Sequence, residues 1–250
     1  MIPALLAAAL VWLPPESFTQ WGQVDALLLA RPELKLTIAL TPAMATPAAK
    51  ASLGRWVASG RVEIAARVDG DPVLPLIAAH PAAPRPDDAL ELSAEARQAV
   101  EFAMGTGPAG FVPGSGALDS SLIEPLGASG APWVLAGPYA AAGSTWAAEG
   151  KVVFVPGRAL PRDATPSAED LAGGGALVVD ESAEADSFLL PALAGGASPF
   201  RGWATVAEEV QTALPGRTVA KDAASWPDWS GAAAAVPSDA SARAAWDAYG

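Results

Sequence analysis

Asp180 is the residue whose position points most directly to chemistry. It follows the apolar run ALVV at positions 176–179, so its carboxyl group would lie at the carboxyl end of a buried strand. Catalytic carboxylates of parallel α/β barrels lie at such strand ends. Without a second carboxylate beside it, the favoured alternative is a cap for a helix that begins near Ala183. The next acidic residues, Glu181 and Glu184, are expected to be solvated.

Glu63 is a carboxylate inside a second apolar run, Gly60 to Ile64 (GRVEI). A charge buried alone in an apolar strand is costly, so Glu63 is expected to be paired or close to solvent. Arg61 and Arg67 are the expected partners. Two roles remain possible for Glu63: it could form a structural ion pair at the rim of a barrel, or it could bind a ligand.

Tryptophan is unusually common, with nine residues against six phenylalanines and two tyrosines. Aromatic faces stack on sugar rings, and they also fill hydrophobic cores. Trp226 and Trp229, in the sequence SWPDW, have a loop-like context and are the candidates for a sugar-stacking platform. The tryptophans expected to serve as packing residues are Trp12, Trp56, Trp133, Trp203 and Trp246.

Seven short apolar runs alternate with helix candidates, and this order predicts a parallel sheet with crossover helices. The expected strands are Leu6–Leu13, Leu34–Leu40, Val62–Ala66, Gly110–Val112, Pro132–Ala136, Val152–Val155 and Ala176–Val179. The expected helices are Phe18–Leu29, Ala45–Val57, Ser93–Met104, Ser120–Ala128 and Ala183–Leu193. We expect a single domain over residues 1–250, in which Pro81–Asp88 is a linker.

Composition excludes several classes of function. The net charge of -12 and the lack of a basic run argue against a nucleic-acid partner. With no cysteine and one histidine, neither a thiolate nor a histidine-rich metal site is available, and no cofactor is expected. The first thirteen residues (MIPALLAAALVWL) are too short to span a bilayer. They fit a buried strand better than a targeting segment because no positive charge precedes them, which favours a cytoplasmic location.

Five segments, in order, resemble the amino-terminal barrel of glycoside hydrolase family 57 (the α-amylase and 4-α-glucanotransferase type), whose members act on α-glucans. They are RPELKLTIALTP at 31–42, WVASGRVEIAARVDGDPVLPLI at 56–77, FVPGSGAL at 111–118, ALVVDESAEADSFLL at 176–190, and the closing region 225–249. The resemblance implies an α/β fold, a (β/α)7 barrel of mostly parallel strands like those of glycoside hydrolases and deacetylases. It also implies a shortened chain, since family members usually continue into helical segments.

The same resemblance implies roles for individual positions. Asp180 takes the place of the catalytic acid, Glu63 that of a residue that orders the pocket, and Trp226 and Trp229 belong to the closing motif. Ser115 occupies the position of the nucleophilic glutamate.

Ser115 is not expected to act as a nucleophile, because a serine needs an adjacent base and the only histidine, His80, lies in a Pro-rich stretch. Asp71 replaces a family histidine, and Leu13-Pro14-Pro15 replaces a His-Gln-Pro motif. We interpret these three replacements as the loss of glycosidase chemistry.

The sequence therefore predicts a family 57-like domain without glycosidase turnover, retained to bind a carbohydrate such as an α-glucan or a protein partner. One alternative is an active retaining glycosidase or glucanotransferase with a relocated nucleophile, for which Asp119 and Glu124 are the candidates. Another alternative is a structural or assembly subunit, whose sign would be an exposed apolar patch. No membrane span is expected.

Overall fold

The structure is a computed structural model that describes residues 9–78, 86–118, 122, 126, 130–136, 147–149, 152–159, 176–194 and 204–213. Its strands are β1 (Ala9–Leu13), β2 (Leu36–Leu40), β3 (Val62–Ala66), β4 (Gly110–Phe111), β5 (Trp133–Ala136), β6 (Ala147–Glu149), β7 (Val152–Ala159) and β8 (Ala176–Asp180). Its helices are α1 (Trp21–Ala30), α2 (Pro47–Ala58), α3 (Leu74–Ala78), α4 (Pro86–Met104), the short 3-10 helix η1 (Gly114–Gly116), α7 (Leu189–Ala194) and α8 (Val206–Ala213).

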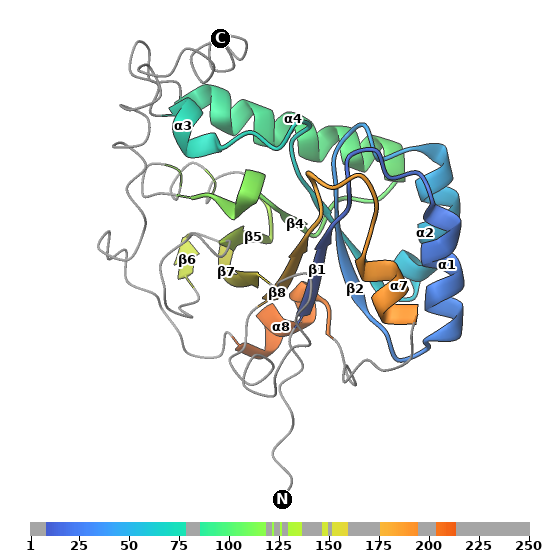
Figure 1. Ribbon diagram of the computed structural model, residues 1–250. Helices are drawn as coiled ribbons and strands as arrows, with labels where there is room; N and C mark the ends of the chain where they lie inside the picture. The colour runs from blue at the N-terminus through green and yellow to red at the C-terminus, as the bar shows by residue number, and fades with distance from the viewer. Residues whose placement is uncertain are drawn as a thin grey trace, which may run out of the picture.

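Seven of these strands form a closed parallel barrel (Figure 1). Each strand pairs in parallel with the next around the ring, in the order β1, β2, β3, β4, β5, β7, β8 and back to β1. The pairing of β5 with β7 closes the ring, and β6 adds to β7 in the antiparallel direction. The predicted (β/α)7 barrel of mostly parallel strands is therefore confirmed.

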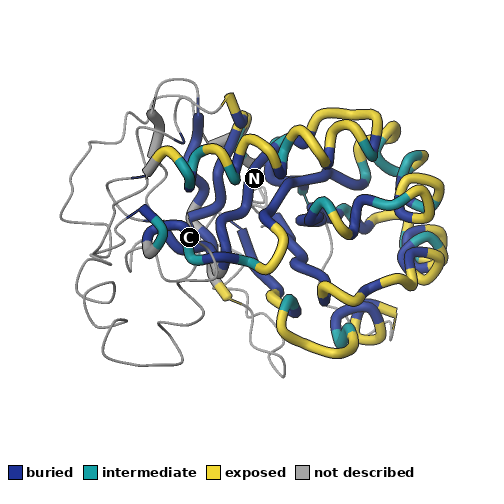
Figure 2. Tube along the Cα trace, turned by 90° about the horizontal axis from the view of Figure 1, so that it is seen from above, coloured by how far each residue is buried: buried dark blue, intermediate teal, exposed yellow. Residues whose placement is uncertain are grey.

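The strands have two apolar faces because both sides of the barrel wall are covered. One cluster of buried side chains, which includes Leu10, Ile38 and Ile64, packs against the surrounding helices. The other cluster fills the inside of the barrel with alternate residues of the same strands, such as Val11, Ala39 and Ala65. Figure 2 shows these buried strands at the centre and the exposed surfaces on the outer helices.

Trp133 is the largest side chain of the inner cluster, and its indole restricts the size of the residue that faces it on the neighbouring strand. It pairs with Gly110 of β4, where an added Cβ would lie 2.1 Å from the indole. Only a glycine leaves room for this indole inside the barrel.

The helix α4 begins earlier than the sequence predicted. It starts at Pro86, with Asp87 and Asp88 in its first turn, a sequence that suits the amino end of a helix. Ser93, the predicted start, lies inside the helix, where its hydroxyl donates a hydrogen bond to the carbonyl of Ala89 at 2.8 Å. The predicted linker Pro81–Asp88 was therefore wrong in its last three residues.

Most other predicted elements agree with the structure within a few residues, but the helix predicted over Ala183–Leu193 begins only at Leu189. All seven predicted strands are present, and β3 has the predicted bounds. The sequence did not predict α3, α8 or β6. Of the predicted helix Ser120–Ala128, only Leu122 and Leu126 are described, and both are buried. Within the described part of the chain, none of the helices has the length and apolar character that crossing a bilayer requires.

Candidate functional site

Asp180 is the last residue of β8, and its side chain is exposed at the carboxyl-terminal mouth of the barrel. Its Oδ1 accepts hydrogen bonds from the backbone N–H of Ser182 at 3.0 Å and from the Ser182 hydroxyl at 2.6 Å. These bonds form a local turn. The predicted helix cap near Ala183 is wrong for Asp180, because the following helix begins at Leu189.

Glu181 is fully buried, which contradicts its predicted solvation. Its Oε2 accepts a hydrogen bond from the indole N–H of Trp12 at 2.7 Å. Its Oε1 accepts the backbone N–H groups of Phe188 at 2.9 Å and Leu189 at 2.7 Å. The capping role expected for Asp180 thus belongs to Glu181, since its carboxylate satisfies N–H groups at the start of α7. Glu184 is exposed, as predicted.

Arg67 and Asp71 form a second polar group where the chain leaves β3. Arg67 is fully buried, and its guanidinium donates to the carbonyl of Pro14 at 3.1 Å and to Oδ2 of Asp71 at 3.3 Å. The side chain of Asp71 is 14% exposed. Asp71 also has a φ of 47°, a left-handed backbone conformation that non-glycine residues rarely adopt.

Asp71 and Asp180 lie close enough to influence one another. Burial raises the pKa of Asp71, the charge of Arg67 lowers it, and the negative charge of Asp180 raises it again. The Ser182 hydroxyl, which donates to Asp180, also stabilises the ionised form of Asp71. Asp71, which stands where the family has a histidine, thus brings a second carboxyl group near Asp180.

Ser115 lies in η1, immediately after Gly114, whose backbone rests on the loop that carries Asp71. A Cβ on Gly114 would lie 2.4 Å from the Asp71 carbonyl oxygen and 2.3 Å from that of Pro72. The segment in the predicted nucleophile position is therefore packed directly against the Asp71 loop. The Ser115 side chain and His80 lie outside the described residues.

Glu63 is inside the barrel but nearer its amino-terminal end. It precedes Arg67 by four residues, which is about 13 Å along an extended strand. Its Oε2 accepts the backbone N–H of Ala207 at 3.0 Å, and its Oε1 lies 3.4 Å from the hydroxyl of Thr37. Burial raises the pKa of Glu63 to about 7, and hydrogen bonds from Ala207 and neighbouring side chains oppose this rise.

The ion pairs predicted for Glu63 are wrong. Arg61 donates to backbone carbonyls of Leu28, Arg31 and Leu34, and Arg67 reaches Pro14 and Asp71. The described residues contain no cluster of acidic or histidine side chains that could hold a metal ion. Trp226, Trp229, Asp119 and Glu124 lie outside the described part of the chain, so the structure places none of these predicted residues.

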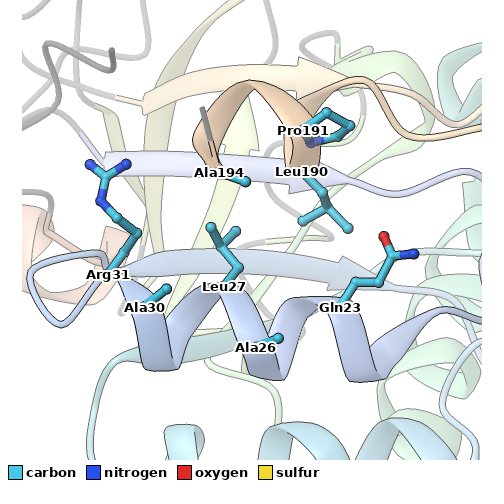
Figure 3. Close-up of a pocket in the computed structure, with 8 residues that line it drawn as sticks. All are labelled: Gln23, Ala26, Leu27, Ala30, Arg31, Leu190, Pro191 and Ala194. Carbon is cyan, nitrogen blue, oxygen red and sulfur yellow. The ribbon is translucent and has the colours of Figure 1, made fainter. Parts of the chain in front are cut away.

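A cavity of about 340 Å³ lies on the outer helix layer, away from the barrel mouth (Figure 3). Its walls are α1 and α7, from which Leu27 and Leu190 point toward each other. Arg31 closes one end and donates a hydrogen bond to the carbonyl of Leu193 at 2.7 Å. The cavity contains neither Asp71 nor Asp180, so it is separate from the polar group at the mouth.

Solved structures share this barrel, although no family model matches the chain and no curated protein does. The 4-α-glucanotransferase from Thermococcus litoralis superposes with a TM-score of 0.57 at 16% identity, over 82% of this chain and 38% of that one. The Xyl-CE4 domain of a multidomain xylanase from the hindgut metagenome of Trinervitermes trinervoides superposes with a TM-score of 0.54 at 13% identity. The match covers 85% of this chain and 94% of that domain. The family 4 carbohydrate esterase from Streptomyces lividans superposes with a TM-score of 0.50 at 14% identity. The match covers 88% of this chain and 100% of that one.

These similarities concern the fold. The chain spans less than half the length of the glucanotransferase but nearly all of the two esterase domains. The predicted resemblance to the glucanotransferase type of barrel is confirmed at this level. The chain therefore has the β/α-barrel fold that this glucanotransferase shares with the family 4 carbohydrate esterases.

Proposed function

We propose that this chain is a carbohydrate-binding domain that holds a sugar at the carboxyl-terminal mouth of the barrel and does not cleave it. The observation that carries the proposal is the carboxyl group of Asp180, which is exposed at this mouth and lies near enough to Asp71 for its charge to raise the pKa of Asp71. Carboxylate oxygens accept hydrogen bonds from sugar hydroxyls. The solved structures with the same barrel are named as carbohydrate-active proteins, which supports a sugar as the ligand class.

The geometry of Asp71 argues against turnover. A retaining glycosidase needs one carboxylate that attacks the anomeric carbon and a second carboxyl group about 5 Å away. Oδ2 of Asp71 is bound to Arg67, and Oδ1 is buried within the protein. Neither oxygen is therefore presented to a sugar ring in the mouth, and Ser115 supplies no carboxylate.

The sugar contacts proposed for the tryptophans and for Glu63 differ in their support. Trp226 and Trp229 are proposed to stack on the ligand because of their residue type and their motif. Glu63 lies at the other end of the barrel and binds α8, so its proposed part in a sugar site has less support than that of Asp180.

Binding and cleavage can be tested in one series of measurements. Isothermal titration calorimetry with maltoheptaose, xylohexaose and chitohexaose should detect binding of at least one oligosaccharide by the unmodified protein. D180N should weaken that binding, and chromatography of overnight mixtures should show no shorter products. E91Q, at an exposed position of α4, is the matched control. Failure of all three sugars to bind would contradict the proposal.

An active retaining enzyme is the second candidate, because two carboxyl groups, Asp71 and Asp180, lie near one another at the mouth. In that case Asp180 would be the acid, and Asp71 would have to turn away from Arg67 into the mouth to act as the relocated nucleophile. Shorter products would then form with the unmodified protein and disappear with both D71N and D180N. Products that persist in both variants would point to a contaminating activity.

A further inference from the structure

The helix α8 covers the amino-terminal end of the barrel, opposite the polar group at the mouth (Figure 1). Ala204, just before this helix, forms a parallel bridge with Ala9 at the start of β1. Val206 is fully buried and belongs to the cluster that fills the inside of the barrel. The helix is therefore the floor of the barrel interior.

The first turn of α8 is held from inside the barrel by two polar side chains. The backbone N–H of Val206 donates to Oγ1 of Thr37 at 3.2 Å, and that of Ala207 donates to Oε2 of Glu63 at 3.0 Å. These N–H groups have no partner within the helix, so the two side chains satisfy donors that would otherwise be buried without a bond. Thr37 and Glu63 are paired residues of neighbouring strands.

A lysine at this end of the barrel does not neutralise Glu63. Lys35 forms an ion pair with Glu208 of α8. Glu208 also accepts the N–H of Thr205 at 3.0 Å, and its own N–H lies 3.4 Å from the Thr205 hydroxyl, which is a capping box. Among the described residues, the groups that act on the Glu63 carboxyl are uncharged, namely the hydroxyls of Thr37 and Thr205, the indole of Trp133 and the N–H of Ala207.

While α8 is docked, the buried surroundings of Glu63 favour the protonated form of its carboxyl group. Ionised Glu63 would be a buried charge with no counter-ion in the described part of the chain, and burial raises its pKa to about 7. When α8 leaves, water reaches the carboxyl group and its pKa returns toward the ordinary value of 4.5. The docked state thus binds the proton more tightly, so docking is strongest below pH 4.5 and weakens as the pH rises toward 7.

We propose that α8 is a proton-dependent floor of the barrel, which is docked while Glu63 is protonated and is released as Glu63 ionises. The capping box, the Lys35–Glu208 pair and the buried Val206 keep the helix intact and return it to the same place. This device lies away from the mouth, and it does not depend on whether the mouth binds a sugar.

A single cysteine at Val206 tests the proposal, because the chain has no cysteine of its own. In V206C the thiol lies on the first residue of α8 and is buried against the barrel interior, so an uncharged thiol reagent modifies it only after the helix has undocked. The labelling rate at each pH is divided by the rate for the urea-unfolded protein, which removes the intrinsic titration of the thiol. Between pH 5 and pH 8 we expect this ratio to rise roughly 10- to 100-fold.

Two variants make the outcome decisive. E63Q in the V206C background keeps an oxygen acceptor for Ala207 but cannot ionise, so its ratio should stay low and independent of pH. V24C places a thiol at a fully buried position of α1, far from α8, and reports global unfolding. Its ratio should stay well below that of V206C at each pH, because releasing α8 requires less free energy than unfolding the whole chain.

The proposal is overturned by any of three results: a V206C ratio that does not change with pH, an E63Q variant that retains the change, or a V24C ratio as high as that of V206C. If V206C does not fold, amide exchange of Val206 and Ala207 in the unmodified protein, corrected for the intrinsic pH dependence, gives the same comparison with E63Q.

Discussion

The indole N–H of Trp12 donates a hydrogen bond to Oε2 of Glu181 at 2.7 Å, and this bond joins β1 to the residue that follows β8. The other carboxylate oxygen holds the first backbone N–H groups of the α7 region. One buried side chain therefore connects two neighbouring strands of the barrel to the helix that packs outside them.

Replacement of Glu181 by alanine should destabilise the fold strongly. E181A would remove the acceptor of two buried N–H donors, those of Trp12 and Leu189, and of the half-buried N–H of Phe188. Each buried donor left without a partner costs about 1–3 kcal/mol. We expect the free energy of unfolding to fall by about 3 kcal/mol or more in urea denaturation. E181Q, which keeps one carbonyl oxygen, should lose less. E91Q, at an exposed site, should change stability by less than about 0.5 kcal/mol.

Gly110 should not tolerate even a methyl group. In G110A the added Cβ would meet the indole of Trp133 at about 2.1 Å, so the barrel interior would have to shift at a cost of about 1–3 kcal/mol or more. The matched control is G54A on α2, where nothing lies within 4 Å of an added Cβ. G54A should raise the melting temperature, because alanine favours a helix over glycine by about 1 kcal/mol. Equal effects of the two substitutions would contradict this account.

Arg67 and Asp71 should be energetically coupled. R67M leaves the Asp71 carboxyl with no cation in a site where it is 14% exposed, and D71N removes the counter-charge of a fully buried guanidinium. Breaking one side of such a pair costs about 3–5 kcal/mol, whereas replacing both sides costs less. A double-mutant cycle by urea denaturation should therefore give a coupling energy above about 1 kcal/mol. Additive effects would show that the two side chains act independently.

Global stability should also depend on Glu63. Its pKa of about 7 in the folded chain lies above its ordinary value, so ionisation disfavours the folded state as the pH rises from 4.5 to 7. E63Q should therefore be about as stable as the unmodified protein at pH 4.5 and more stable at pH 8. Urea denaturation at both values measures the difference. A constant difference across this range would show that Glu63 is not the titrating group.

The sequence predicted the strands well because their signal is local. Each strand is a short apolar run bounded by glycine, proline or polar residues, and both faces are buried in a parallel barrel. The element α8 was missed because its role depends on contacts with Glu63 and Thr37, which are more than 140 residues away along the chain. The start of α4 was missed because Pro86 was read as part of a linker rather than as the first residue of a helix.

The site was predicted less well for the same physical reason. The position of Asp180 at a strand end follows from the apolar run before it, and the structure agrees. The choice between Asp180 and Glu181 as the capping carboxylate could not be made from spacing, since it depends on which side chain turns inward to meet Trp12. The closeness of Asp71 and Asp180 depends on the return of β8 to the side of β1, which no local pattern reveals.

The closed ring of seven parallel strands also limits how this protein can assemble. Each of these strands is paired on both sides, so none of the seven offers a free edge to an extended segment of another chain. Strand addition, a common route to both recognition and aggregation, is unavailable to this part of the sheet. Within the described part of the chain, association with another molecule is then left to the outer helices, to the loops at the two ends of the barrel and to β6, which pairs with β7 alone.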